Sequence, residues 1–287
     1  MRVLVTGATG FVASHLVPAL AATHEVVALG HEESRIPSGG GIEPLVLDLR
    51  TVQPSDLPAV DAVVHLAQAN VPFPDGALDL HAVNTAATLA LLEHARLCGA
   101  SRFVFSSSAS VYGLGDRQWT EDDVPAASDF YAATKLAAER FVRAYAQFFG
   151  TTILRLVAPY GPGQRNRMIP RLIASVQEGR PITLNAEAKP RMNPIFVDDV
   201  VRVIDRALAS GGDQLVNAAG DEAATIRQIA ESIGRAIGAT PVFEQGAAES
   251  GDIVCDNSRM KRAFALDDLV PLADGLRLTA DAVSAAA

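Results

Sequence analysis

The stretch Thr6-Gly7-Ala8-Thr9-Gly10-Phe11-Val12-Ala13 joins a short β-branched segment to a segment with the apolar spacing of a helix. Two glycines at such a junction permit a tight turn whose backbone N–H groups approach a pyrophosphate, and the helix N-terminus adds partial positive charge. The alternative is a glycine turn that merely joins two elements, but the strand and helix around it favour the binding role. The residues expected beside a dinucleotide are Gly7, Thr9, Gly10, Phe11 and Val12.

The same pattern continues along the first two thirds of the chain, where β-branched segments alternate with longer amphipathic ones. The strands are predicted over Arg2–Thr6, Glu25–Leu29, Leu45–Leu47, Ala62–His65, Arg102–Ser106 and Thr152–Leu156. The helices are predicted over Phe11–Ala21, Leu78–Leu97 and Phe130–Phe148. This alternation is typical of a doubly wound α/β fold, in which helices cover both faces of a parallel sheet.

In the last third of the chain, turns rich in Pro and Gly separate the predicted helices Ile169–Gln177 and Ile226–Ile237. Thr225 and Gln228 form a capping box for the second of these. The segment Pro194–Val203 has the pattern of a strand followed by a helix, so we expect the chain to return to the first domain there. The expected division is a dinucleotide-binding domain of residues 1–157 plus about 193–217, and a smaller C-terminal α/β substrate lobe of about 158–192 and 218–287.

The composition is that of a globular protein, since 49% of the 287 residues are hydrophobic and 20% are charged. A formal net charge of -9 argues against a nucleic-acid partner, because affinity for phosphates needs clustered Lys and Arg. Cys98 and Cys255 lack metal-ligand spacing and fit packing roles in a reducing compartment. The chain shows no signal-peptide pattern and no apolar run of membrane length, so we expect a cytoplasmic protein with no membrane partner and no metal.

Tyr131 and Lys135 are four residues apart, so they share one face of a predicted helix. Lowering a tyrosine pKa from about 10 towards neutrality requires about 4 kcal/mol of preference for the phenolate, which an adjacent ammonium can supply. Ser108 and Ser110 follow the fifth predicted strand, at the end where open α/β sheets bind ligands. We therefore expect Ser108, Tyr131 and Lys135 to be catalytic, Ser108, Ser110 and Tyr131 to contact the substrate, and Tyr131 and Lys135 to contact the cofactor.

Each of these features alone has a plain structural explanation. A Tyr–Lys pair at helical spacing is often a surface pair, and a run of serines is often a loop. Their order after the glycine turn makes the catalytic interpretation the stronger one.

The residues at the end of the second predicted strand bear on the choice between NAD and NADP. A carboxylate there would bind the ribose hydroxyls of NAD, whereas a basic residue would suit the 2′-phosphate of NADP. Gly30 removes the expected acid, and His31 or Arg35 could contact a phosphate. Glu32 and Glu33 stand close enough to replace the carboxylate, and each charge is equally well explained as part of a solvated loop. The cofactor is therefore NAD or NADP, with NADP slightly favoured.

With these motifs the chain resembles the extended short-chain dehydrogenase/reductases, specifically the NAD-dependent epimerase/dehydratase family that acts on nucleotide sugars. The resemblance runs essentially from end to end. It implies a Rossmann fold, a homodimer formed through the helices around Leu78–Leu97 and Phe130–Phe148, and a small-molecule substrate. Further residues that match family motifs are Asp48 and Leu49 near the adenine, His65, Leu66 and Ala67 where backbone passes the cofactor, Asn84, Arg155, Tyr160-Gly161-Pro162-Gly163-Gln164, Arg191, Asp198 and Asp199.

Some positions depart from the family pattern. Family dehydratases carry an Asp-Glu pair directly after the catalytic hydroxyl residue, where this chain has Ala109-Ser110, so a 4,6-dehydratase is not expected. Ala158 replaces an asparagine of many members, and the loop Gln68–His81 is short and rich in proline, which points to an altered substrate pocket. Asp198 and Asp199 are expected to cap a helix. Arginines that could offset a diphosphate are Arg191, with the best motif context, and Arg165, Arg167 and Arg171, each of which fits a surface charge as well.

Three functions follow, in decreasing order of preference. The first is a nucleotide-sugar epimerase, in which Tyr131 takes a sugar hydroxyl proton while the C4 hydride passes to nicotinamide and later returns to the other face. The second is a reductase of the same family, in which NADPH reduces a keto-sugar or a small ketone. The third, of another class, is a non-catalytic dinucleotide-sensing module, which the intact Ser108, Tyr131 and Lys135 disfavour.

Overall fold

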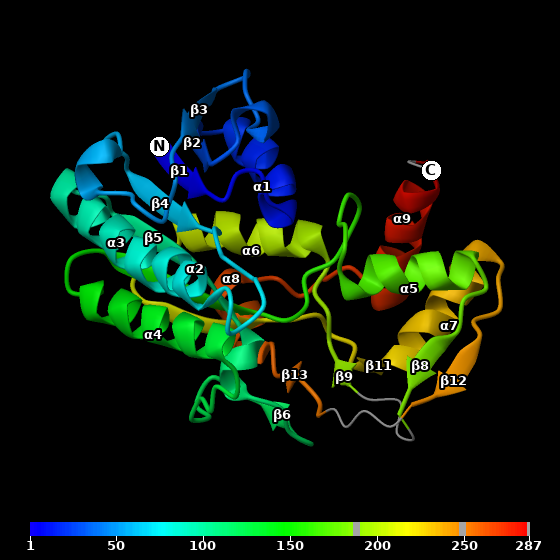
Figure 1. Ribbon diagram of the computed structural model, residues 1–287. Coiled ribbons are helices and arrows are strands. Elements are labelled where there is room, and N and C mark those ends of the chain that lie inside the picture. The colour runs from blue at the N-terminus through cyan, green and yellow to red at the C-terminus, as the bar shows by residue number, and fades with distance from the viewer. Residues whose placement is uncertain (186–189, 247–250, 286–287) are drawn as a thin grey trace. The chain divides into compact units, whose positions relative to one another are not determined.

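The computed structural model describes residues 1–185, 190–246 and 251–285 (Figure 1). The strands are β1 Arg2–Thr6, β2 Glu25–Gly30, β3 Ile42–Val46, β4 Ala62–His65, β5 Arg102–Ser108, β6 Gln118–Trp119, β7 Gly150–Leu156, β8 Ile182–Leu184, β9 Arg191–Met192, β10 Gln214–Ala218, β11 Ala224–Thr225, β12 Phe243–Gln245 and β13 Val254–Cys255. The α-helices are α1 Phe11–Ala21, α2 Ala77–His81, α3 Ala87–Cys98, α4 Phe130–Tyr145, α5 Met168–Gln177, α6 Val197–Ala209, α7 Ile226–Ile237, α8 Ser258–Phe264 and α9 Leu272–Ala285. A π-helical turn, Ala82–Ala86, lies between α2 and α3, and a 3-10 turn, Ala109–Tyr112, follows β5.

The chain divides into two compact units. The first contains Met1–Gly113, Val124–Arg155 and Val201–Val216, and the second contains Leu114–Asp123, Leu156–Val200 and Asn217–Ala287. This division differs from the expected domain ranges at residues 114–123 and 193–200, both of which the sequence placed in the first domain; the return to the first unit begins at Val201. The position of residues 114–123 has a structural cause. They belong to the second unit because β6 pairs in parallel with β13 near the C-terminus.

The first unit is built on a parallel seven-stranded sheet with the order β10-β7-β5-β4-β1-β2-β3. β1 lies between β2 and β4, with Val3 opposite Val26 on one side and Ala62 on the other. Because helices cover both faces of such a sheet, three consecutive residues of β1, Val3, Leu4 and Val5, are fully buried. The strand order reverses between β1 and β4, which is where doubly wound folds bind ligands beyond the carboxyl ends of the strands.

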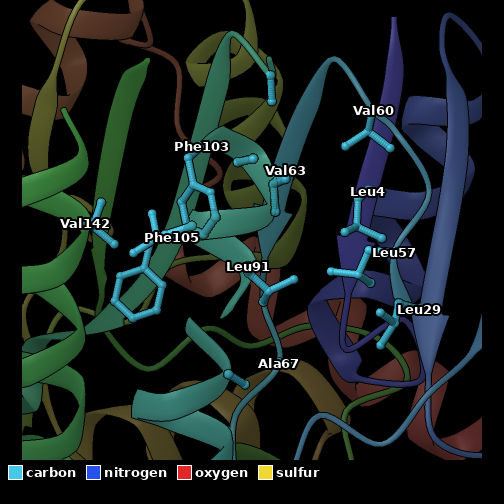
Figure 2. Packing of buried hydrophobic residues seen from close by; sticks show 14 of the residues in the cluster. Leu4, Leu29, Leu57, Val60, Val63, Ala67, Leu91, Phe103, Phe105 and Val142 are labelled. Carbon is cyan, nitrogen blue, oxygen red and sulfur yellow. The ribbon is translucent and has the colours of Figure 1, made fainter. Parts of the chain in front are cut away.

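One face of the sheet packs against α3 and α4, which lie side by side (Figure 1). Figure 2 shows Leu4, Val63 and Phe105 of the sheet in one apolar cluster with Leu91 of α3 and Val142 of α4. All five side chains are 0% exposed, and full burial of each contributes roughly 1.5–3 kcal/mol to stability. This packing fixes α4 against β5.

The predicted doubly wound α/β fold is confirmed, and most predicted elements are present within a few residues. β3 begins at Ile42 rather than Leu45, because this edge strand is half exposed and its apolar pattern is weak. The fourth helix ends at Tyr145 rather than Phe148. The helical segment predicted over Leu78–Leu97 is present but contains the π turn, which apolar periodicity does not reveal.

The segment Pro194–Val203 contains the predicted helix but not the predicted strand. Before α6, only Phe196 forms an isolated bridge, with Tyr160. A proline at position 194 removes one N–H donor from any sheet ladder there. The strand that joins the large sheet comes later, at Gln214–Ala218, where no strand was predicted.

In the second unit, helices α5, α7 and α9 pack against one another. The predicted capping box of α7 is confirmed, since the Gln228 N–H donates to Thr225 Oγ1 at 3.2 Å and Gln228 Oε1 accepts from the Thr225 N–H at 2.9 Å. Cys255 is buried in β13, and Cys98 is half-buried and packs against the core of the first unit; neither cysteine forms a disulfide.

Within residues 1–185, 190–246 and 251–285, no helix combines the length and apolar character needed to cross a membrane. The same residues contain no group of three or more His, Cys, Asp or Glu side chains placed to hold a metal ion.

Gly7 provides a test of how closely β1 and β4 approach each other. Its φ is +72°, and a Cβ at this position would lie 2.8 Å from the Cα and the N of Ala67. We expect Gly7→Ala to destabilise the protein by about 3 kcal/mol, since left-handed strain and a clash with backbone add together. The measurement is the free energy of urea-induced unfolding without ligand.

Gly99→Ala is the matched control. Gly99 has a φ of +74°, but no described heavy atom lies within 4 Å of its Cβ position. This variant carries only the backbone strain and should lose about 1–2 kcal/mol. Equal losses in the two variants would contradict the close approach of Ala67 to the turn.

Candidate active site

The turn after β1 ends in an open helix N-terminus. Gly10 has extended backbone angles, and its N–H donates to the Gly7 carbonyl at 2.8 Å. α1 then begins at Phe11 without a side-chain cap, so its first N–H groups are available to an anion. Thr9 and Val12 flank the turn and are half-buried. A Cβ at position 7 would meet the Ala67 backbone, so the turn requires glycine there, and the available N–H groups at the start of α1 fit a pyrophosphate.

The end of β2 is crowded at Gly30. A Cβ there would lie 2.8 Å from Ile36 Cγ1 and 2.9 Å from Thr9 Cγ2. Ile36 and Thr9 pack so closely against Gly30 that a carboxylate side chain at this position would require them to move. Arg35 lies on that loop and forms an exposed ion pair with Glu32 at 3.3 Å.

Asp48 follows β3 and is held by Arg50. The Arg50 N–H and Nη2 donate to its carboxylate at 2.9 and 2.6 Å. Hydrogen bonds from Arg50 and, more weakly, the charge of the exposed His31 hold the pKa of Asp48 below its usual range. Leu49 packs into the core of the first unit. Contacts of Asp48 and Leu49 with an adenine stay predictions, as do those of His31, Arg35 and Leu66 with a cofactor.

A buried polar chain runs beneath the glycine turn. The Ala67 N–H donates to Thr6 Oγ1 at 3.2 Å, and Thr6 Oγ1 lies 2.7 Å from His65 Nδ1. On the other side of the ring, His65 Nε2 lies 3.0 Å from Thr88 Oγ1, which donates to the Asn84 carbonyl at 2.8 Å. The chain therefore links the ends of β1 and β4 to the π turn before α3.

These contacts fix the state of His65. Since Thr88 uses its hydroxyl hydrogen on a carbonyl, it must accept from His65 Nε2–H, which leaves Nδ1 to accept from Thr6. Burial, with a further contribution from the charge of Lys135, lowers the pKa of His65 to about 3. His65 is thus a neutral positioning group.

Asn84 ties the loop after β4 to the start of α4. Its Oδ1 accepts from the Ala69 N–H at 2.8 Å, while its Nδ2 donates to the Ala69 carbonyl and to Thr134 Oγ1, both at 3.1 Å. Thr134 Oγ1 in turn donates to the Tyr131 carbonyl at 2.7 Å. The π turn therefore places the Asn84 side chain where it bonds both to Ala69 of the loop and to Thr134 of α4.

α4 positions Tyr131 and Lys135. Asp129 caps the helix, because its Oδ1 accepts a first-turn N–H at 2.7 Å. Tyr131 and Lys135 follow one turn apart on one face. Tyr131 is half-buried, and its hydroxyl donates to Gln68 Oε1 at 2.7 Å.

Ser108 ends β5, against which α4 packs. The N–H and the hydroxyl of Ser110 donate to Ser108 Oγ at 3.2 and 2.9 Å. Because Ser108 Oγ accepts both hydrogen bonds, its own hydrogen can be offered to a substrate oxygen. The fold thus brings Ser108, Tyr131 and Lys135 to one region of the first unit.

Lys135 is the least compensated charge of that region. Its side chain is 0% exposed, Nζ lies 4.6 Å from the centre of the Phe105 ring, and Nζ has no hydrogen-bond partner among the residues that the structure describes. Burial lowers the pKa of Lys135 to about 7, against an opposing effect of Glu139. A buried ammonium with unused donors fits the ribose hydroxyls of a bound dinucleotide.

A buried ion pair continues the same helix face. Glu139, one turn after Lys135, accepts from Arg155 Nε at 2.9 Å, from Arg155 Nη2 at 2.7 Å and from Ser107 Oγ at 2.6 Å. Both charged side chains are 1% exposed, and the Arg155 guanidinium also lies over the Tyr112 ring at 4.6 Å. Burial alone would lower the pKa of Arg155, but the hydrogen bonds that it donates to Glu139, together with the charge of that carboxylate, outweigh burial and raise this pKa.

Arg191 belongs to the second unit. Its N–H donates to Asp252 Oδ1 at 2.8 Å, and its half-exposed guanidinium lies 3.8 Å from the same carboxylate. Its part in binding a diphosphate stays a prediction.

Two further positions matched or departed from the family pattern. Ala158 has a φ of 38°, in the left-handed region that asparagine tolerates better than alanine. Asp199 lies in the first turn of α6, and its Oδ2 accepts from the Val270 N–H at 2.9 Å.

Comparison with known proteins places this site in a family. The sequence profile of the NAD dependent epimerase/dehydratase family matches residues 3–219. The chain belongs to this family. It is accordingly an enzyme of the extended short-chain dehydrogenase/reductase type, as predicted.

Two curated relatives show the range of reactions among epimerase/dehydratase family members. The UDP-glucose 4-epimerase of Mycolicibacterium smegmatis is 30% identical, and the match covers 98% of both chains. The dTDP-4-dehydro-6-deoxy-D-allose reductase of a Streptomyces species is 29% identical over 97% of this chain and 94% of the relative. Among solved structures, MoeE5 in complex with UDP-glucuronic acid and NAD superimposes with a TM-score of 0.90 at 29% identity, over the full length of both chains.

Sequence reasoning missed three polar residues of the site in this epimerase/dehydratase family member. Gln68 contacts the Tyr131 hydroxyl, Thr134 bonds to Asn84, and Glu139 neutralises Arg155. The spacing of Glu139, four residues after Lys135, was a usable signal. An arginine inside an apolar strand also needs a buried acid, although the sequence does not say which one.

Lys135 gives a pH-dependent prediction. In the unfolded chain it titrates near 10.5, whereas in the folded protein its pKa is about 7. Below pH 7 the residue is protonated in both states and the burial penalty is fully present. Between pH 7 and 10.5 the folded state releases its proton first, so stability rises with pH.

We therefore expect Lys135→Met to stabilise the cofactor-free protein at pH 6 by several kcal/mol, on the order of 3–5. The advantage over wild type should shrink by about 1.4 kcal/mol per unit between pH 7 and 9. Chemical denaturation at each pH measures both effects.

Lys261→Met is the control, because Lys261 pairs with Asp221 near the surface at 2.7 Å. It should change stability by about 0–1 kcal/mol without this pH dependence. A loss of stability in Lys135→Met at pH 6 would show that the ammonium has a partner in the free protein.

Proposed function

We propose that the protein is a nucleotide-sugar epimerase that works through transient oxidation of a sugar carbinol, with C4 the expected position. The observation that carries this proposal is the buried Lys135 ammonium, which has unused donors on the same helix face as Tyr131. A dinucleotide ribose and a tyrosine phenolate are the partners that such a charge would stabilise. Epimerase relatives of nearly the same length support the choice of reaction.

Tyr131 is the proposed acid/base. As a phenolate it takes the proton of the substrate hydroxyl, and as a phenol it returns that proton to the ketone oxygen. The positive charge of Lys135 lowers the free energy of the phenolate. Ser108 donates a hydrogen bond to the same substrate oxygen and holds it beside Tyr131.

The cofactor has a limited and separate task. When bound, the nicotinamide accepts a hydride from the carbinol carbon and gives one back. Gly7 and Gly10 would hold the pyrophosphate, and Lys135 would hold the ribose. The part of the protein in this chemistry is to position the ring and to move the proton.

A reductase of the same family is the second candidate. Gly30 favours it, since loss of the carboxylate at the end of β2 suits NADP(H), and one relative is a reductase of a dTDP-keto-sugar. Purified protein that retains tightly bound NAD would support the epimerase. Exchangeable NADPH would support the reductase, and protein that binds dinucleotide without turnover would support a sensing module.

Tyr131→Phe tests the assigned chemistry. We expect kcat to fall by about 10²- to 10⁴-fold, because the proton has no acceptor, while dinucleotide affinity changes little. The assay is a panel of UDP-, GDP- and dTDP-sugars with each cofactor, followed by mass spectrometry and proton NMR.

Tyr145→Phe is the matched control. Tyr145 lies on the same helix, but its hydroxyl donates to Glu93 at 2.8 Å, away from Ser108 and Lys135. This variant should keep its turnover. Unchanged turnover in Tyr131→Phe on a confirmed substrate would refute the catalytic assignment.

The cofactor preference has its own test. We propose that NADP binds somewhat more tightly than NAD because Arg35 contacts the 2′-phosphate. Arg35→Ala should then weaken NADP⁺ binding by about tenfold and NAD⁺ binding by less than about twofold, as expected for one charge-assisted contact. Calorimetric titration measures both constants.

Glu32 competes for the same guanidinium, so Glu32→Ala should strengthen NADP⁺ binding. If Arg35→Ala weakens the binding of NAD⁺ and NADP⁺ by the same factor, Arg35 does not contact the 2′-phosphate. NAD preference would then rest on Glu33 or on backbone contacts.

Homodimerisation and cytoplasmic residence stay predictions. Exposed apolar side chains on the helices expected to form a dimer support the first of these. They are Leu78 of α2, Leu89 and Leu97 of α3, and Phe148 just after α4.

A further inference from the structure

The Tyr131 hydroxyl donates a hydrogen bond to the side-chain amide of Gln68, a neutral group that can both accept and donate. Gln68 follows Ala67 directly beyond the end of β4, and its Oε1 accepts from Tyr131 Oη at 2.7 Å. The Gln68 side chain is exposed, so the contact does not result from core packing. It joins the Tyr131 oxygen to the loop that follows β4.

The loop that carries Gln68 is fixed at two points. Ala69 makes two hydrogen bonds with the buried Asn84 side chain, at 2.8 and 3.1 Å. Farther along, Phe73 stacks on Phe130, with ring centres 4.9 Å apart and planes 21° apart. The backbone after Gln68 is therefore held near the start of α4, which keeps the Gln68 side chain within reach of Tyr131.

A carboxamide can serve both protonation states of a phenol. Its oxygen accepts from the neutral hydroxyl, as in the structure, and after a half-turn about its last bond its NH₂ donates to a phenolate. A hydrogen bond to the charged form lowers the pKa of an acid. No carboxylate at the same place could do this, since it would only accept and its charge would oppose the phenolate.

We propose that Gln68 is a catalytic residue that partners the Tyr131 oxygen before and after proton transfer and, together with Lys135, lowers the pKa of Tyr131. During turnover the amide accepts from the phenol in one state and donates to the phenolate in the other. The proton itself passes only between Tyr131 and the substrate oxygen. This role rests on the proposed function of Tyr131 as acid/base.

The first test measures the pKa of Tyr131 without substrate or cofactor. The chain has four tyrosines, and ¹³Cζ-tyrosine NMR over a pH titration, with Tyr131→Phe for assignment, isolates the signal. Burial raises the pKa of Tyr160 and of Tyr145, so neither titrates early. Other titratable or charged groups on α4 and the elements packed against it are the same in every Gln68 variant, namely Asp79, His81, Glu93, His94, Arg96, Cys98, Arg102, Tyr112, Lys135, Glu139, Arg140, Arg143 and Tyr145.

Gln68→Glu and Gln68→Leu are the informative variants, and an exposed position should tolerate both. We expect Gln68→Glu to raise the pKa of Tyr131 by about one unit or more, and Gln68→Leu to raise it by about half a unit to one unit. Gln147→Leu, an exposed change just beyond the C-terminal end of α4, is the control and should leave the pKa of Tyr131 unchanged. A shift below about 0.2 unit in Gln68→Glu would overturn the proposal.

The second test uses a confirmed substrate. Gln68→Leu should lower kcat by about tenfold with little change in KM, since the lost contact acts on the proton-transfer step. In Gln68→Glu the pH–rate profile should move upward by the same amount as the NMR titration. Full kcat in Gln68→Leu would overturn the proposal.

The two proposals fail separately. Loss of the acid/base role would appear as full turnover in Tyr131→Phe. Loss of the Gln68 role would appear as unchanged titration of Tyr131, or full turnover in Gln68→Leu, in a protein whose Tyr131→Phe variant is inactive.

Discussion

The burial of the Lys135 ammonium in the first unit is the constraint around which the site is organised. A charge that is 0% exposed and has no hydrogen-bond partner among the described residues requires neighbours that add no second positive charge. His65, which lies close enough for the charge of Lys135 to affect its titration, is neutral. Glu139 is near enough to favour the ammonium, yet its oxygens are occupied by Arg155 and Ser107. The donors of Lys135 therefore stay available to a ligand.

Two hydrogen-bonded systems meet at the π turn before α3. One runs from the end of β1 through His65 to Thr88 and the Asn84 carbonyl, and the other runs from the Asn84 side chain through Thr134 to the Tyr131 backbone. Satisfied networks of this kind rigidify their surroundings, because any break would leave a buried polar group without a partner. The turn that would hold a cofactor and the helix that carries the proposed acid/base are thereby connected through one asparagine.

Much of this arrangement could be predicted from the sequence. The glycine turn, the alternating strands and the four-residue spacing of Tyr131 and Lys135 are local patterns, and local patterns survive folding. The contacts of Gln68 with Tyr131 and of Glu139 with Arg155 are different, since they join residues 63 and 16 positions apart. Such pairs depend on the register of neighbouring elements. The π turn was missed for a related reason, because one extra residue in a helical turn barely disturbs the apolar period.

The clamp formed by Glu139 and Arg155 has a consequence for how such proteins diversify. Arg155 is the last residue of the first unit in that part of the chain, and the second unit begins at the next residue. Insertions, deletions and substitutions after Arg155 therefore lie downstream of a residue that its ion pair with Glu139 fixes to α4. Variation in the second unit can accumulate after this point while Tyr131 and Lys135, on the same helix as Glu139, keep their places, so a change of substrate need not disturb the proposed acid/base.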